Sequence, residues 1–173
     1  MTVADLKTHL RVDHDDEDAI IALYRNAAIA KVENLTNRKL DRVTAEFYFD
    51  DWQTVTLPWS PVASITSITY KTSASSTSTL PTSEYWATLN SSTPRVYFNS
   101  TPSLFTNAAE RIKLTAEVGY DASADETPEP LIAAVRMLTM DIYEMRGDTL
   151  IGGIPRTVPN GVAALISEYR NLG

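Results

Sequence analysis

Asp141 and Glu144 are the two residues whose spacing comes nearest to catalytic chemistry. They stand three positions apart in an apolar stretch, so on a helix they would lie one turn apart and could work as a general acid–base pair. Arg136 and Arg146 flank them in the sequence, and ion-paired or solvent-facing positions are the simpler interpretation. An enzyme using Asp141 and Glu144 stays open as a third hypothesis.

The other polar residues do not form a known catalytic or metal-binding pattern. The two histidines, His9 and His14, are not spaced to suggest a triad, and the chain has no cysteine. The acidic run 13–18 resembles a calcium loop, but Asp18 and Tyr24 occupy the places where an EF-hand needs Gly and Glu. We therefore predict no catalytic residue, no cofactor and no metal, and we expect the acidic run to offset the dipole of the following helix.

Composition limits the class of protein further. The 173 residues carry a formal net charge of −7, which argues against a surface that grips nucleic acid phosphates but not against one that DNA merely passes. No apolar run approaches the roughly 18 residues that a membrane-spanning helix needs. The first residues lack the apolar core of a secretion signal. We expect a protein made in a cytoplasm, without a membrane partner.

Two regions show helical periodicity. A central helix is predicted within 127–147, starting near two prolines and ending at Gly147. Its inner stripe is predicted at the apolar residues that step by four and three: Leu131, Val135, Leu138, Ile142 and Met145. Residues 1–40 predict a short helix capped by Thr2, with Asp5 completing a capping box, and then a longer helix from about 16 to 35. Asn37 is the expected left-handed residue after the longer helix. For the longer helix, the main inner stripe is predicted at Ile20, Leu23, Tyr24, Ala27, Lys31 and Leu35, broadened by Ile21, Ala28 and Val32.

Between these helical regions, residues 41–120 change to an alternating pattern. β-branched and aromatic residues predict strands over 43–49, 54–57, 65–70, 85–89, 95–98 and 111–118. The Ser/Thr-rich stretch 72–79 has nothing to bury and predicts a loop. Trp52, Trp59 and Trp86 either fill the β core or form a ligand platform. The region predicts a small antiparallel β subdomain inserted between helices.

The last region, 148–173, predicts a C-terminal arm. Val162, Leu165, Ile166 and Tyr169 share one face of a short helix, and Gly152 and Gly153 precede it as a hinge. A helix of about ten residues is marginal alone, so it is ordered only when docked on its own core or on a partner. The fold class predicted is therefore α+β: a single domain, 1–173, with a small helical bundle, an inserted β subdomain and a hinged C-terminal helix.

The order of several segments resembles the head–tail connector, or adaptor, proteins of long-tailed bacteriophages. These segments are LKTHLRVD (6–13), ENLTNRKL (33–40), LPWSPVASI (57–65), VGY (118–120), PEPLIAAV (128–135) and PNGVAALISEYR (159–170). Asn37 stands where such sequences often have Gly. The resemblance extends over nearly the whole chain, from about residue 3 to residue 171.

The resemblance implies a structural virion protein at the head–tail junction. It implies a ring, commonly of twelve copies, that lies under the portal protein, extends the DNA channel and meets a downstream neck or tail completion protein. In the family the C-terminal segment usually contacts the portal, so we predict portal docking at Val162, Leu165, Ile166, Tyr169 and Arg170. For contacts between copies we predict Ile132, Met140, Tyr143 and Tyr24, which add apolar surface to the helices. DNA would pass through the channel without sequence-specific binding.

A hypothesis from another class stays open beside the connector. The chain could be a monomeric β-domain binding module, with the tryptophans as its platform and the helices as its scaffold. The mass of the protein in solution, measured with and without the portal, separates the two hypotheses.

Overall fold

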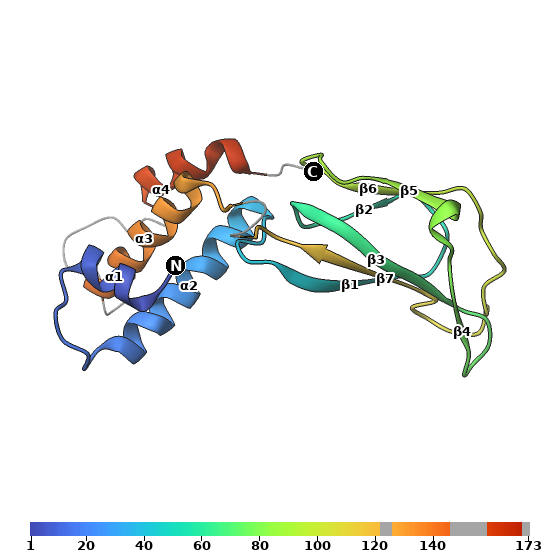
Figure 1. Cartoon of the computed structure of the whole chain (residues 1–173), viewed down its shortest axis with the longest axis horizontal. Helices are drawn as coiled ribbons and strands as arrows, with labels where there is room; N and C mark the ends of the chain where they lie inside the picture. The colour runs from blue at the N-terminus through green and yellow to red at the C-terminus, as the bar shows by residue number, and fades with distance from the viewer. Residues whose placement is uncertain (122–125, 146–158, 171–173) are drawn as a thin grey trace. The chain divides into compact units, whose positions relative to one another are not determined.

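The computed structural model describes residues 1–121, 126–145 and 159–170, which form two compact units (Figure 1). The helical unit comprises Met1–Thr36 and Glu126–Arg170, and the β unit comprises Asn37–Asp125. Helices and antiparallel sheets thus occupy separate stretches of the chain, which confirms the predicted α+β class. The assignment of both units to a single domain stays a prediction.

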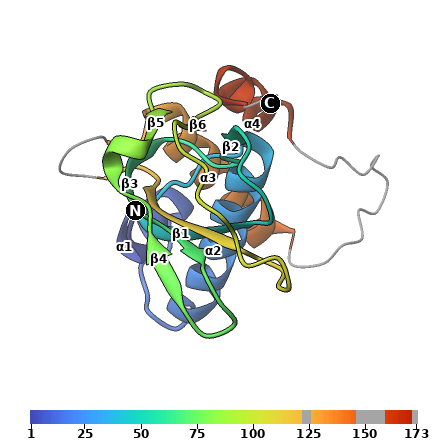
Figure 2. The same ribbon diagram turned by 90° about the vertical axis from the view of Figure 1, so that its right-hand side faces the viewer.

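The described residues of the helical unit, 1–36, 126–145 and 159–170, form four α-helices (Figure 2). They are α1 (Val3–Leu10), α2 (Asp18–Thr36), α3 (Glu129–Glu144) and α4 (Asn160–Ile166), which is followed by the 3-10 turn η2 (Ser167–Tyr169). Helix α3 contacts α1, α2 and α4, so it is the element that the others cover. The predicted central helix therefore holds the unit together.

Helix α1 begins at the predicted cap. The Thr2 hydroxyl accepts a hydrogen bond from the Asp5 N–H at 3.2 Å, and the Asp5 carboxylate accepts one from the Thr2 N–H at 2.8 Å. These reciprocal bonds satisfy donors that the first turn leaves free, and they form the capping box that the sequence predicts. Leu6 is fully buried on the inner face of α1.

The acidic run after α1 is held by a lysine. Lys7 Nζ bonds to the Asp15 carboxylate and lies 2.8 Å from Asp18 Oδ1. The Asp15 hydrogen bond, and after it the Asp18 one, raises the pKa of Lys7, and the same Lys7 hydrogen bond lowers the pKa of Asp15. The run thus ties α1 to the start of α2.

Helix α2 buries a different stripe from the main stripe predicted for it. Ile21, Ala28, Val32 and Thr36 are buried, whereas Leu23 is 63% exposed. The buried residues include the three that were expected only to broaden the stripe. The prediction for Leu23 is wrong because both sets of residues have helical spacing, and contacts with α1 and α3 decide which set faces inward.

Helix α3 follows its prediction closely. It runs from Glu129 to Glu144, and Leu131, Val135 and Leu138 of the predicted stripe are buried. Ile142 is half-buried, but the prediction for Met145 is wrong: it is 47% exposed, because the helix ends at the residue before it. Thr139 is buried as well, and its hydroxyl donates to the Val135 carbonyl at 2.8 Å. Gly147, predicted to end the helix, lies outside the described residues, as does the predicted hinge at Gly152 and Gly153.

Over its described stretch, 37–121, the β unit forms two antiparallel sheets. The four-stranded sheet has the order β1 (Val43–Phe49), β7 (Ile112–Val118), β3 (Val62–Lys71) and β4 (Thr77–Thr79). The three-stranded sheet has the order β2 (Val55–Thr56), β6 (Arg95–Phe98) and β5 (Tyr85–Thr88). The predicted loop over 72–79 is wrong for its last three residues, because β4 pairs with the end of β3.

Alternation along β7 organises the core of the β unit. Ile112, Leu114, Ala116 and Val118 are buried, and the residues between them are half-buried on the other face. One core cluster joins this strand to residues from both sheets, including Val55, Leu57, Ile68 and Val96. The unit is therefore a two-sheet arrangement around one apolar core.

Candidate functional site

The carboxylate pair considered for catalysis lies on the outer part of α3. Asp141 is half-buried and Glu144 is exposed. Within the described residues, no three His, Cys, Asp or Glu side chains gather closely enough to hold a metal ion. In the same part of the chain, no helix is both long and apolar enough to span a bilayer.

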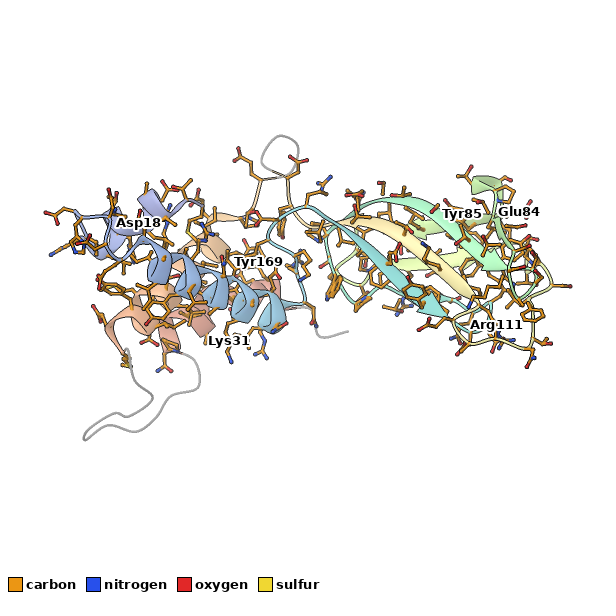
Figure 3. The ribbon with its side chains drawn as sticks, turned by 90° about the horizontal axis from the view of Figure 1, so that it is seen from below. Asp18, Lys31, Glu84, Tyr85, Arg111 and Tyr169 are labelled. Carbon is orange, nitrogen blue, oxygen red and sulfur yellow. The ribbon has the colours of Figure 1, made fainter. Side chains whose placement is uncertain are left out.

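The predicted portal-docking residues fall into two groups in the structure. Val162 is fully buried and Ile166 is 2% exposed, where α4 lies against α3 and α2. Leu165 and Tyr169 are half-buried and Arg170 is exposed; Tyr169 is labelled in Figure 3. With α4 in this position, only the second group can reach a partner.

Gly161 lies beside the end of the Met137 side chain where α4 meets α3. A Cβ atom at position 161 would lie 2.7 Å from the terminal methyl carbon of Met137. Val162 and Ile166 therefore enter the helical core beside a contact that is made by a glycine backbone and a methionine tip. The packing of this short helix on its own core is one of the two outcomes that the sequence analysis left open.

The predicted contacts between copies retain accessible surface. Met140 is 37% exposed, and Ile132, Tyr143 and Tyr24 are half-buried. Tyr143 also has a structural role, because its hydroxyl donates a hydrogen bond to the Glu17 carboxylate and joins α3 to the residue before α2. Ile132, Tyr143 and Tyr24 are thus partly packed within one copy and keep part of their surface accessible to a second copy.

The helical unit exposes further large apolar side chains that were not assigned to a surface. Leu23 is 63% exposed, Met145 is 47% exposed and Met137 is 39% exposed. None of these side chains has a polar group that benefits from water, apart from the weakly accepting methionine sulfur. Helical periodicity alone could not identify Leu23 as exposed, because neighbouring positions on α2 are also apolar.

The three tryptophans do not share one environment. Trp52 makes edge contacts with Tyr70 and Phe98, and its indole N–H donates to the Pro102 carbonyl at 2.8 Å. Trp59 packs on Phe47, and both Trp52 and Trp59 lie against the β core. Trp86 is the exception, so a platform made by all three tryptophans is not formed.

Trp86 forms an exposed aromatic pair on the three-stranded sheet. It is 50% exposed on the edge strand β5 and stacks on Tyr97 of β6, with ring centroids 5.1 Å apart and planes 11° apart. The two residues are directly opposite in the strand register. Sequence reasoning missed the pair, because the register of β5 on β6 was not predicted.

The outer face of the four-stranded sheet is polar and internally paired. Glu46 accepts hydrogen bonds from the Tyr48 hydroxyl at 2.6 Å and from Lys113 Nζ at 3.0 Å. These bonds, the Tyr48 bond first, lower the pKa of Glu46, and the bond to Glu46 raises the pKa of Lys113. This polar face differs from the exposed surface of the helical unit, where association would remove apolar side chains from water.

Comparison of the chain with known proteins identifies a family to which it is similar. The sequence model of the family described as "Phage gp6-like head-tail connector protein" matches residues 1–92. No curated protein matches the chain.

Solved structures of phage-like particles contain similar chains. One chain in "Virion of native gene transfer agent (GTA) particle" is 27% identical, with a TM-score of 0.81, and the match covers 98% of this chain and 89% of that one. A chain in "Neck of empty GTA particle computed with C6 symmetry" matches with the same identity and coverage and a TM-score of 0.78. A third, in "Neck of native GTA particle computed with C12 symmetry", is 27% identical with a TM-score of 0.77, covering 97% of this chain and 87% of that one.

The family match extends over more than half of the 173 residues, and the structural matches include both units, from α1 to α4. The resemblance inferred from the order of sequence segments is therefore confirmed by independent comparisons. This chain belongs to the phage gp6-like head–tail connector proteins.

Proposed function

We propose that this connector acts as a ring of identical copies in the neck of a phage-like particle, where it joins the portal to the next tail component. The observation that carries the proposal is the exposed apolar surface of the helical unit, at Leu23, Met137, Met140 and Met145. The similarity to a neck chain in a particle reconstructed with C12 symmetry supports a copy number of twelve.

A ring requires head-to-tail contacts between two different surfaces of each copy. The predicted residues Ile132, Met140, Tyr143 and Tyr24 supply one apolar surface on α3 and α2, and exposed Leu23 extends the candidates on α2. Each contact can be weak, because closure of the ring multiplies identical contacts through effective concentration. A single copy can therefore keep these side chains exposed and remain stable.

Portal docking is assigned to the C-terminal arm. Leu165, Tyr169 and Arg170 are accessible with α4 packed on α3, and they supply an apolar, an aromatic and a cationic contact. Val162 and Ile166 remain in the assignment only if α4 leaves its place on α3, since both are buried there. We therefore expect Leu165, Tyr169 and Arg170 to make the first contact with the portal.

The role proposed is structural and not enzymatic. The family of head–tail connectors supports this, and the two carboxylates considered for catalysis lie on the outer part of α3, where Asp141 is half-buried and Glu144 is exposed. DNA passes through the ring without sequence-specific contacts, in keeping with the formal net charge of −7.

Ring formation is tested by placing a charge on the apolar surface. We expect Met140→Asp to leave the circular dichroism spectrum unchanged and to abolish the twelve-copy species when the protein is mixed with portal, as measured by native mass spectrometry. Thr88→Asp, which puts the same charge on an exposed residue of β5, is the matched control. Normal rings from Met140→Asp would remove α3 from the interface.

Portal docking is tested separately with Leu165→Asp and Tyr169→Asp. Particles carrying the double variant are expected to fill with DNA but to lack tails in electron micrographs. Ala164→Asp, an exposed position on the same helix, controls for the added charge. Normal attachment of tails with the double variant would contradict the assignment. Equal loss of tails in the control would mean that the added charge, and not these two side chains, is responsible.

The exposed Trp86–Tyr97 pair favours one alternative, a monomeric binding module that uses the β unit. Replacing Trp86 by Ala tests it: a monomer that loses a small ligand while particle assembly continues supports the module. A normal ring with normal tails before and after the substitution supports the connector.

A further inference from the structure

Strand β1 is the longest edge strand among the described residues of the β unit. It forms one border of the four-stranded sheet, where it pairs with β7 (Figure 1). It has seven residues, whereas the other edge strands, β2, β4 and β5, have two, three and four. An edge strand presents backbone donors and acceptors with which a further strand can pair. β1 therefore offers the longest stretch of backbone for such pairing.

Two hydrogen bonds at the ends of β7 show in which direction its backbone groups point. The Lys71 N–H donates to the Arg111 carbonyl at 2.8 Å, and the Gly119 N–H donates to the Pro61 carbonyl at 2.8 Å. Lys71 ends β3 and Pro61 directly precedes it, so both bonds lie on the β3 side of β7. Backbone groups point to alternate sides along a strand, so the even-numbered residues of β7 point toward β1.

The same alternation divides the backbone of β1. Its odd-numbered residues lie opposite the even-numbered residues of β7 and exchange hydrogen bonds with them. The N–H and C=O groups that point away from β7 belong to Thr44, Glu46 and Tyr48. Within residues 1–121, 126–145 and 159–170, these backbone groups have no hydrogen-bond partner, because the bonds of the three residues are made by their side chains. All three residues are exposed.

β1 lacks the features that usually keep an edge strand from pairing. Such features include a short strand, a proline, a lysine or a bulge. The sequence of β1 is VTAEFYF, and all seven residues pair with β7 without a shift in register. Its one charged side chain, Glu46, accepts hydrogen bonds from Tyr48 and Lys113 on the same sheet. The backbone of β1 is therefore already in the extended conformation that a further strand needs.

A second copy of the chain is a poor partner for this edge. In the antiparallel register that engages all three outward residues, Thr44 lies opposite Tyr48 of the other copy, and Glu46 lies opposite its counterpart. Like charges directly opposite each other on paired strands are destabilising. The other described edge strands are two to four residues long, so they match only part of β1. The edge therefore favours a strand from a different protein.

The side chains along β1 define the chemistry of a strand that fits. Segment 41–51 carries four carboxylates and one arginine, a formal charge of −3, with Glu46 at its centre. A lysine or arginine opposite Glu46 would add an attractive cross-strand pair. On the other face of β1, Phe47 and Phe49 are half-buried and Val43 is 40% exposed. Apolar residues at alternate positions of the added strand would cover these side chains.

We propose that β1 binds an extended peptide segment of another protein as an additional antiparallel strand. The segment carries a lysine or arginine opposite Glu46 and apolar residues at alternate positions. In this mode of recognition, main-chain hydrogen bonds provide the affinity and side chains provide the selectivity. The inference does not depend on ring formation or on portal docking, because β1 lies in the β unit of one copy.

The test is a titration of the full chain with the synthetic peptide VTVKVTV, blocked at both ends and followed by amide resonances. We expect saturable shifts and slower hydrogen exchange at the amides of Thr44, Glu46 and Tyr48. The peptide VTVEVTV places like charges opposite each other and is expected to bind at least about threefold more weakly. The lysine peptide with N-methyl groups on its threonines and its lysine lacks the donors that face β1, and it is expected not to bind.

A charge reversal in the chain tests the selectivity. Glu46→Lys is expected to bind VTVEVTV more tightly than VTVKVTV, a preference that an unfolded variant could not show. Asp16→Lys makes the same change in net charge at a side chain of the helical unit that is 94% exposed. This control is expected to keep the preference of the natural chain for the lysine peptide.

Four results would overturn the proposal. The first is the absence of shifts at the outward amides of β1 with the lysine peptide. The second is equal binding of the N-methylated peptide, which would mean that backbone hydrogen bonds are not involved. The third is an unchanged preference in Glu46→Lys. The fourth is a shift of the same amides when the concentration of the chain alone is raised, which would make a second copy the occupant of the edge.

Discussion

The β unit and the helical unit differ in what they leave exposed. In the β unit, the exposed aromatic side chains have partners: Tyr48 donates to Glu46, and Trp86 stacks on Tyr97. In the helical unit, exposed Leu23, Met137, Met140 and Met145 are aliphatic or thioether side chains. The β unit also exposes Val43, at 40%, but its exposed aromatic rings have partners within one copy. The four side chains of the helical unit gain most from being removed from water.

This difference separates two tasks within one small chain. The β unit surrounds its core with two sheets and keeps a polar outer face, so its stability depends on its own packing. The helical unit has a buried core around α3 as well, but its surface is suited to association. Substitutions that act on packing and substitutions that act on association should therefore have different effects in the two units.

The largest effect on stability is expected in the β core. Leu114→Ala removes a fully buried side chain from the central strand β7, and we expect the free energy of unfolding to fall by about 3 kcal/mol. Denaturation by urea, followed by circular dichroism, measures it. Thr115→Ala on the opposite face is the control, and a loss of similar size there would mean that both faces of β7 are packed.

A smaller effect is expected where α1 begins. Thr2→Ala removes the hydroxyl that accepts the Asp5 N–H, and the free energy of unfolding should fall by about 1 kcal/mol. Thr8→Ala changes an exposed threonine of the same helix and should cost much less. Equal losses in the two variants would show that α1 does not depend on its capping box.

The Lys7–Asp15 contact gives a pH-dependent effect that is smaller still. Asp15 has a pKa below its ordinary 3.8, so its contribution to stability is present above that pH and is lost as pH falls through the lowered value. Lys7 has a pKa above its ordinary 10.5, so its contribution is present below that pH and is lost as pH rises through the raised value.

Lys7→Gln should therefore lower the melting temperature slightly at neutral pH. At pH values below the lowered pKa of Asp15, the difference from the natural chain should shrink as Asp15 becomes neutral. Thermal melting at several pH values measures it. A constant difference across the acid range would assign the role of Lys7 to packing of its aliphatic chain and not to its charge.

The smallest change in stability is expected at the most exposed apolar residue. Leu23→Asp should alter the free energy of unfolding of one copy by less than about 0.5 kcal/mol, because the side chain is 63% exposed. The same substitution should prevent ring formation with the portal if α2 contributes to the interface. A loss of stability as large as that of Leu114→Ala would place Leu23 in a core and erase the contrast between the units.

Local rules in the sequence predicted many elements correctly. Thr2 and Asp5 have the types and spacing of a capping box, Asn37 takes the predicted left-handed backbone with φ of 54°, and β7 alternates as expected. In each case the determining residues are neighbours in the chain. Contacts between distant segments were not needed to infer them.

Features that depend on distant contacts were missed. The buried face of α2 is set by its contacts with α1 and α3. Strand β4, Thr77–Thr79, forms because it pairs with β3, although its Ser/Thr composition does not predict a strand. The stacking of Trp86 on Tyr97 depends on a register between β5 and β6 that periodicity does not contain. The same holds for the hydrogen bond from Arg42 Nε to the carbonyl of Gly119, a residue 77 positions away in the chain.

The contact between Gly161 and Met137 allows small changes in the position of α4 on α3. An added methyl group at position 161 would meet only the far end of an unbranched side chain, which can rotate aside without moving either backbone. Related chains can therefore change this residue while α4 keeps its place, and small displacements of the helix are absorbed by the thioether. A rigid side chain in place of Met137 could not rotate aside, so the position of α4 would be fixed by that contact.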